Sequence, residues 1–179
     1  MSNTGKNMQV LPKKWFALYT RARYEKRVEE ELRRKEIEVF LPKLKTKKQY
    51  TDRKKTVEEP LFKSYVFVKI VYSRKHLDVL ETDGVVCFIK SERKPVVIRN
   101  REIDAVKRLI QSNKELEVTN RKFQEGEKVR IAEGPLRGIE GKVKRMHGKA
   151  KLQVFIDEIG QGLLVELHES RVKKLKHLV

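Results

Sequence analysis

The spacing of apolar residues changes near residue 120, and this change divides the chain into two parts that predict different kinds of fold. Before it, runs of strand length alternate with segments of helical spacing. After Phe123, short apolar runs are separated by glycines, as is typical of a small all-β domain. We therefore predict an α+β N-terminal domain, with an antiparallel-rich sheet flanked by helices, followed by a small all-β barrel.

The first part gives the clearest element signals. The strongest strand signal is Leu61–Ile70, which we expect to begin just after Pro60 because proline cannot continue a ladder. Ser73 is expected to cap one helix and Asn100 another. Residues 111–122 show no sustained period, so the domain boundary is expected there. The expected divisions are a flexible N-terminus at 1–13, the N-terminal domain at 14–112, a linker at 113–122 and the barrel domain at 123–179.

The charge of the chain points to the class of its partner. Its 179 residues include 43 Lys and Arg against 25 Asp and Glu, which gives a net charge of +18. Clustered cations favour a polyanionic partner such as nucleic acid. A hydrophobic share of 39% allows a core and argues against wholesale disorder. The single cysteine excludes an intramolecular disulfide framework, and no segment approaches the roughly 20 apolar residues of a membrane span. We expect a cytoplasmic protein that does not enter a membrane.

No group of residues in the sequence predicts catalysis or metal binding. The four histidines show no metal-ligand spacing with one another or with Cys87. The sequence also lacks a nucleophile-elbow motif and a phosphate-binding Walker loop. We therefore expect no enzyme activity, no metal and no cofactor.

A basic tract at residues 43–55 holds seven cations against one anion, Asp52. It forms either a solvated hairpin that only keeps the protein in solution or an arm that follows a nucleic-acid backbone. A second cluster lies at the start of the first helix, where an exposed helix face is the alternative. The candidate phosphate contacts in the two clusters are Arg21, Arg23, Arg27, Lys47, Lys48, Arg53, Lys54 and Lys55.

The aromatic residues Trp15, Tyr19, Phe62 and Tyr65 have two interpretations. As alternating strand residues they belong in a core, whereas an apolar groove rimmed by cations would be a protein-binding site. Tyr65 shares a strand face with Lys69, an unusual neighbour in a fully buried layer. We therefore expect that face to be at least partly accessible, with Phe62 and Tyr19 completing an aromatic depression.

Three stretches of the sequence form a recognisable series. They are residues 15–20 (WFALYT) with 25–28 (EKRV), residues 60–68 (PLFKSYVFV) and residues 129–143 (VRIAEGPLRGIEGKV). In this order they resemble the NusG family of transcription elongation factors. The first two resemble the N-terminal domain of the family. The third resembles its C-terminal KOW motif, represented here by Arg130, Gly134, Pro135, Gly138 and Gly141. The order and spacing cover about residues 13–176.

The resemblance implies a non-enzymatic transcription antitermination and elongation factor. Its N-terminal domain would dock on the clamp helices of the largest subunit of RNA polymerase, contact non-template DNA and suppress pausing and termination. The implied docking residues are Tyr19, Phe62 and Tyr65, with Trp15 in support. The KOW domain would recruit a small-subunit ribosomal protein or the termination factor Rho. We expect a monomer that acts in the bacterial cytoplasm.

Details of the sequence are similar to the specialised RfaH and UpxY-like members of the family. They include the run Tyr19-Thr20-Arg21 and the tract at residues 52–55. An RfaH-type DNA reader carries a His-Thr-Thr-Thr run in its second helix, and the matching stretch here is Lys75-His76-Leu77-Asp78. Lys75 and His76 are candidate contacts to the non-template strand, with a helix-surface role as the alternative.

A rival interpretation is an RNA-binding or ribosome-associated KOW protein that does not act on polymerase. Phe62 and Tyr65 separate the two interpretations, because polymerase docking needs these rings exposed in a groove and an RNA-binding protein would bury them. The C-terminal region is punctuated by glycines and Pro135, which are unfavourable in a helix interior. We therefore expect strands there, rather than the helical hairpin for which RfaH is known.

Overall fold

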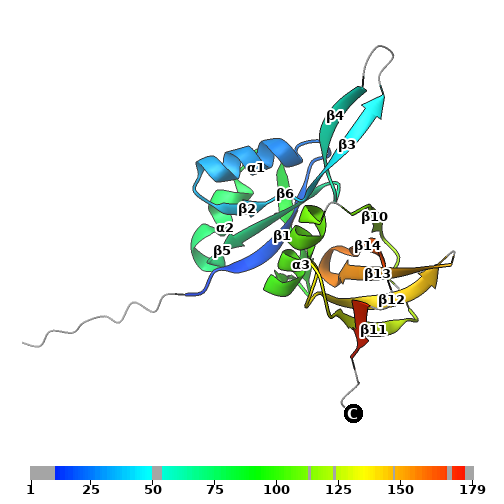
Figure 1. Cartoon of the computed structure of the whole chain (residues 1–179). Helices are drawn as coiled ribbons and strands as arrows, with labels where there is room; N and C mark the ends of the chain where they lie inside the picture. The colour runs from blue at the N-terminus through cyan, green and yellow to red at the C-terminus, as the bar shows by residue number, and fades with distance from the viewer. Residues whose placement is uncertain are drawn as a thin grey trace, which may run out of the picture.

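The structure, a computed structural model, describes residues 11–49, 54–112, 114–122, 124–146, 148–168 and 171–175. One antiparallel sheet forms the centre of the N-terminal half (residues 11–112) and another forms the C-terminal half (residues 114–175). Helix α3 (Asn100–Gln111) lies between the two halves in Figure 1. Helices cover both faces of the N-terminal sheet, as the α+β prediction requires.

Strand β1 (Lys14–Thr20) is the centre of the N-terminal sheet and is paired on both sides. Phe16 and Leu18 pack in one apolar cluster with α1 (Glu25–Arg34) and α2 (Tyr72–Leu80), whereas Trp15 and Ala17 pack in a second cluster with α3. Both faces of β1 are therefore buried, which explains its unbroken apolar run. The order of the sheet is β2 (Glu38–Phe40), β5 (Tyr65–Ile70), β1 and β6 (Val85–Phe88), and β9 (Val97–Ile98) also pairs with β1.

Long-range packing sets where the helices begin. Helix α2 begins at Tyr72, with Val71 rather than Ser73 preceding it, so the predicted cap at Ser73 is wrong. The helix includes Tyr72, and the ring of this residue packs against those of Phe16 and Phe88. The distances from its centroid to theirs are 5.3 and 5.2 Å.

Helix α3 is likewise preceded by Arg99 rather than by the predicted cap Asn100. The backbone N–H of Arg99 donates to the Oε2 atom of Glu102 over 3.1 Å. This contact from the Glu102 carboxylate closes the first turn of the helix.

A long hairpin made of β3 (Lys43–Gln49) and β4 (Lys54–Pro60) projects away from the N-terminal sheet in Figure 1. Pro60 is the last residue of β4, and β5 begins only at Tyr65, so the expectation of a strand directly after Pro60 is wrong. Residues 61–64 instead form a bend and a turn, which is closed by the hydrogen bond that the backbone N–H of Tyr65 donates to the carbonyl of Phe62 over 3.2 Å. A second, short hairpin consists of β7 (Lys90–Ser91) and β8 (Lys94–Pro95).

The described part of the C-terminal half consists of strands and one 3₁₀ turn (Asp157–Ile159), as the all-β prediction requires. Its sheet is antiparallel and runs in the order β10-β14-β13-β12-β11-β15. Strand β10 lies within the segment expected to be a linker, and it pairs with β14 instead. The strands are β10 (Leu116–Thr119), β11 (Glu127–Ile131), β12 (Glu140–Met146), β13 (Lys149–Ile156), β14 (Gln161–Leu167) and β15 (Val172–Lys174).

The two halves are in contact through α3. The guanidinium of Arg108 donates to the carbonyl oxygens of Pro135 and Arg137 over 2.8 and 2.6 Å. Apolar residues of α3 and of the C-terminal strands also belong to one continuous buried cluster. The loop between β11 and β12 is therefore held against the N-terminal half.

Candidate functional site

Two tyrosines form an accessible aromatic patch at the end of the N-terminal sheet. Tyr19 and Tyr65 face each other across β1 and β5, and their rings meet edge to face with centroids 5.8 Å apart. Tyr19 is 42% exposed and Tyr65 is half-buried. Burial raises the pKa of the Tyr65 hydroxyl, and the neighbouring Tyr19 and Cys87 raise it further. The Tyr65 hydroxyl is therefore a neutral hydrogen-bond donor at neutral pH.

The other two predicted docking residues are not accessible. Trp15 is 3% exposed, and the ammonium groups of Lys69 and Lys107 lie 5.7 and 5.1 Å from the centre of its ring system. Phe62 is 0% exposed and packs edge to face on Phe67 at 6.3 Å. The expectation of an exposed Phe62 is wrong because the turn after Pro60 folds this ring back toward the core. Of the three residues of the predicted depression, Tyr19 and Tyr65 remain accessible, and the supporting Trp15 is buried.

A buried carboxylate holds the turn that precedes Tyr65. The backbone N–H of Ser64 donates to the Oε1 atom of Glu25 over 2.7 Å, and Ser64 has a φ of 63°. The backbone N–H of Thr20 donates in turn to the carbonyl of Ser64 over 2.9 Å. Helix α1 thus places the start of β5 beside the end of β1. The sequence contained no local signal for Glu25 in this role, because its partner lies 39 positions away.

The arginines predicted at the start of the first helix lie near this patch. Arg21 and Arg27 both pair with Asp83, at 3.2 and 3.0 Å, and both guanidinium groups lie over the ring of Tyr24. More than half of each arginine side chain remains exposed. Such exposed ion pairs are weak, so a phosphate can compete for them. Arg23 is exposed and has a φ of 68°.

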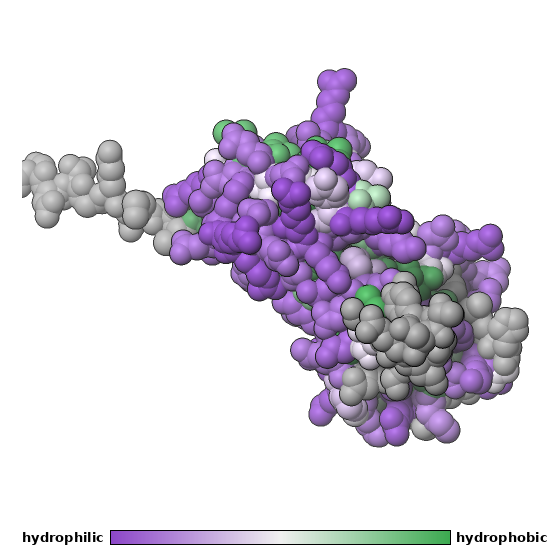
Figure 2. All heavy atoms as spheres, turned by 90° about the horizontal axis from the view of Figure 1, so that it is seen from above, coloured by the Kyte–Doolittle hydropathy of each residue, from purple (hydrophilic) through white to green (hydrophobic). Residues whose placement is uncertain are grey.

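The hairpin cations occupy two paired strands. The Cα atoms of Lys48 and Lys55 are register partners, as are those of Gln49 and Lys54, and Lys47 lies on β3 opposite Thr56. Arg53 lies outside the described residues, and so do the side chains of Lys47, Lys48, Lys54 and Lys55. Figure 2 shows that hydrophilic residues cover most of the face of the protein that is seen from above.

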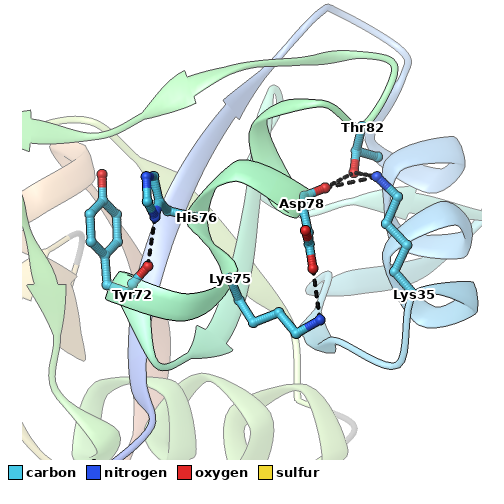
Figure 3. Close-up of polar contacts among 6 residues, drawn as sticks. All are labelled: Lys35, Tyr72, Lys75, His76, Asp78 and Thr82. Atoms are coloured by element: carbon cyan, nitrogen blue, oxygen red, sulfur yellow. Dashed lines mark hydrogen bonds and ion pairs between the residues drawn. The ribbon is translucent and has the colours of Figure 1, made fainter.

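Figure 3 shows Lys75 and His76 engaged with their own helix. The Nζ atom of Lys75 donates to the Oδ2 atom of Asp78 over 2.7 Å, and this contact lowers the pKa of the Asp78 carboxyl. The His76 ring stacks on Tyr72 with centroids 4.9 Å apart, and its Nδ1 atom lies 2.9 Å from the carbonyl oxygen of Tyr72. Lys35, the residue that follows α1, donates from its Nζ atom to the carbonyl oxygen of Asp78 and to the Oγ1 atom of Thr82 over 2.7 and 2.9 Å. The exposed Lys75 remains available to a partner, and half-buried His76 less so.

The residues of the KOW-like motif surround the turn between β11 and β12. Arg130 pairs with Glu140 across these strands. Gly134 and Gly138 have φ values of 79° and 87°, which favour glycine. A Cβ atom on Gly141 would lie 2.3 Å from the carbonyl oxygen of Gln153, so only glycine fits there. Pro135 contributes the carbonyl that accepts a hydrogen bond from α3.

Two further observations limit what the site can be. Among the described residues, His, Cys, Asp and Glu side chains form no group of three or more that could hold a metal ion. In the same part of the chain, no helix is long and apolar enough to cross a membrane.

The comparisons with known proteins agree with this geometry. A family model described as "Transcription termination factor nusG" matches residues 13–107. The NusG termination/antitermination protein of Pasteurella multocida is 29% identical over 175 residues, which cover 90% of this chain and 95% of that one. Its counterpart in Pseudomonas aeruginosa is 28% identical, covering 92% of this chain and all of that one.

A solved structure of Thermotoga maritima NusG, described as showing domain interaction, is 27% identical to this chain. It superimposes with a TM-score of 0.51 over 92% of this chain and 98% of that one. The family match covers more than half of the sequence and includes the whole N-terminal sheet. The chain therefore belongs to the NusG family of transcription termination and antitermination factors.

Proposed function

We propose that this protein binds the clamp helices of elongating RNA polymerase through residues 14–112 and suppresses pausing and termination. Membership of a family of transcription factors supports a non-enzymatic role. The observation that carries the proposal is the Tyr19–Tyr65 pair, which offers two rings on an accessible surface. Aromatic side chains of this kind are the usual anchors of protein interfaces.

The cations near the tyrosine pair suit DNA beside the polymerase. Arg21, Arg23 and Arg27 lie where the chain leaves β1 and enters α1, and the long hairpin projects from the same half of the molecule. In the proposal, these groups and Lys75 contact the phosphates of the non-template strand. The C-terminal half then remains to recruit a small-subunit ribosomal protein or Rho.

The test is the affinity of tyrosine variants for a reconstituted elongation complex. Tyr19→Ala and Tyr65→Ala should each weaken binding at least tenfold, because a hot-spot aromatic contributes about 2 kcal/mol or more. Both variants should also lose the reduction in pausing. Val118→Ala, at an exposed apolar position on β10 in the C-terminal half, is the control and should bind as the unchanged protein does. Unchanged affinity in both tyrosine variants would contradict the proposal.

The rival function is RNA binding without polymerase, and it is tested by measuring the affinity of the same purified protein for RNA. Phe62 and Tyr65 were expected to separate the two interpretations. Phe62 is buried, as expected for the RNA-binding protein, whereas Tyr65 is partly exposed, as expected for polymerase docking. RNA binding by the C-terminal half, with no measurable affinity for polymerase, would favour the rival.

A further inference from the structure

The base of the β3–β4 hairpin contains an ion pair that is largely removed from water. The Nζ atom of Lys43, the first residue of β3, donates to the Oε2 atom of Glu29 over 2.8 Å. Glu29 lies on α1 and is only 6% exposed, and 29% of the Lys43 side chain is exposed. Salt screens a partly buried pair much less than an exposed one. This pair therefore joins the hairpin to α1.

A second cation orients the carboxylate of Glu29. The guanidinium of Arg33, one turn later on α1, donates to the Oε1 atom of Glu29 over 2.9 Å. Each carboxylate oxygen thus accepts a hydrogen bond from a different cation. Arg33 fixes the orientation of the carboxylate from within its own helix, and the Oε2 atom remains directed at Lys43.

The hairpin is held from both of its faces at this point. Successive side chains of a strand point to opposite faces, so Lys43 and Leu44 lie on opposite sides of β3. Lys43 meets α1, whereas Leu44 packs against the apolar cluster to which α3 contributes. The Cα partner of Lys43 is Pro60, the last residue of β4. From this base the two strands project away from the sheet (Figure 1).

The length of the strands makes the direction of the hairpin sensitive to its base. Each strand has 7 residues, and at about 3.4 Å per residue it is about 24 Å long. A rotation of about 10° at the base would move the far end of the strands by about 4 Å. Donor–acceptor distances in N–H···O bonds span only about 0.5 Å. The cations along the strands keep defined positions only if the base is held at a fixed angle.

We propose that Glu29 is a positioning residue, which fixes the direction of the β3–β4 hairpin by holding Lys43 and so determines where the hairpin cations contact DNA in the transcription complex. The contact with DNA is part of the proposed function, and the effect on hairpin direction is independent of it. A role of Glu29 confined to the stability of α1 would need only its pair with Arg33. Such a role would leave the direction of the hairpin unchanged.

The first test measures this direction in the full chain, without polymerase. Nitroxide labels are attached after Lys26→Cys on α1 and Thr56→Cys on β4, two exposed positions, with Cys87→Ser to remove the native thiol. Pulsed electron paramagnetic resonance gives the distribution of distances between the labels. Because Thr56 lies four residues before the end of β4, a tilt of about 10° moves it by about 2 Å. Lys43→Met keeps the aliphatic stem without the ammonium, and it should widen and shift the distribution.

Two further variants separate the ion pair from charge and from packing. Lys43→Arg keeps a cation within reach of Glu29 and should keep the narrow distribution. Lys45→Met makes the same charge change two residues further along β3. Lys45 pairs with Glu58 of the same hairpin at 4.0 Å, and both side chains are exposed. Lys45→Met should therefore leave the distribution unchanged.

The second test uses Glu29→Gln, which removes no cation and makes the protein more positive. A more positive protein attracts DNA more strongly at long range. Affinity for a reconstituted elongation complex should nevertheless depend less on salt, by about 0.7–0.9 in the log–log slope for each phosphate contact that is lost. The reduction in pausing should fall as well. Glu30→Gln makes the same charge change at the exposed neighbouring position and should alter neither quantity.

Several outcomes would overturn the proposal. An unchanged distance distribution in Lys43→Met would show that packing alone directs the hairpin, and equal widening in Lys45→Met would assign the effect to charge in general. A wider distribution in Glu29→Gln with unchanged salt dependence and pausing would reject the functional role. Thermal melting shows whether each variant is folded, and if Glu29→Gln is not, Lys43→Met takes its place in the second test with Lys45→Met as reference. The distance measurement needs no polymerase, so its failure leaves the polymerase proposal untouched.

Discussion

At the scale of single residues, Phe62 and Tyr19 are expected to respond in opposite ways to truncation. Phe62 is fully buried against Phe67, so Phe62→Ala should cost about 3–5 kcal/mol of folding free energy. Tyr19 is 42% exposed, and Tyr19→Ala should cost well under half of that. Chemical denaturation of the two variants measures both values. Equal losses would show that the two rings are buried to a similar degree in solution.

Glu102 gives a residue-scale prediction for pH. Burial raises the pKa of its carboxyl, and the nearby Glu158 raises it further, while the backbone N–H of Arg99 opposes the shift. Because the folded state binds the proton more tightly than the unfolded state does, the contribution of Glu102 to stability is fully present below about pH 4.5. It is lost as pH rises through the raised pKa.

Glu102→Gln, which keeps an acceptor for Arg99, should therefore raise the melting temperature at pH 7 and not at pH 4. Melting curves at the two pH values measure the difference. Asp104→Gln, on the same helix, controls for the change in net charge. A melting temperature that is lowered equally at both pH values would contradict the interpretation.

At the scale of elements, the β3–β4 hairpin should affect nucleic-acid binding without affecting folding. It projects from the sheet, so replacement of Lys47, Lys48, Lys54 and Lys55 by Ala should leave the melting temperature nearly unchanged. The slope of log affinity against log salt should fall by about 0.7–0.9 for each cation that contacts a phosphate. Filter binding across a salt series measures this slope. An unchanged slope would show that the hairpin only keeps the protein in solution.

At the scale of the whole molecule, Arg108 links the two halves. Arg108→Ala removes two hydrogen bonds to the carbonyls of Pro135 and Arg137. We expect faster amide hydrogen exchange in residues 132–139, since the loop between β11 and β12 loses its hydrogen bonds to α3. Arg101→Ala, at an exposed position on the same helix, is the control and should leave this exchange unchanged. Identical exchange in both variants would show that apolar packing alone holds the loop.

The local sequence determined which segments form strands and helices, and it identified the protein family. Alternating Val66, Val68 and Ile70 predicted a core-facing strand, and all three are buried. The glycines after residue 130 predicted strands and turns, and the motifs at both ends predicted NusG. These properties depend on the period of side chains along a strand or helix and on the conformations of single residues, which neighbouring residues determine.

Only the tertiary structure decided which of these residues are accessible. Phe62 is buried because the turn at residues 62–65 brings its ring against Phe67. Trp15 is buried, and the ammonium groups of Lys69 from β5 and Lys107 from α3 lie near its ring. Leu116–Thr119 is a strand because it pairs with β14, although its own sequence shows no clear hydrophobic period. For Trp15 and for Leu116–Thr119 the partner lies many positions away, and no local pattern specifies which distant group will meet it.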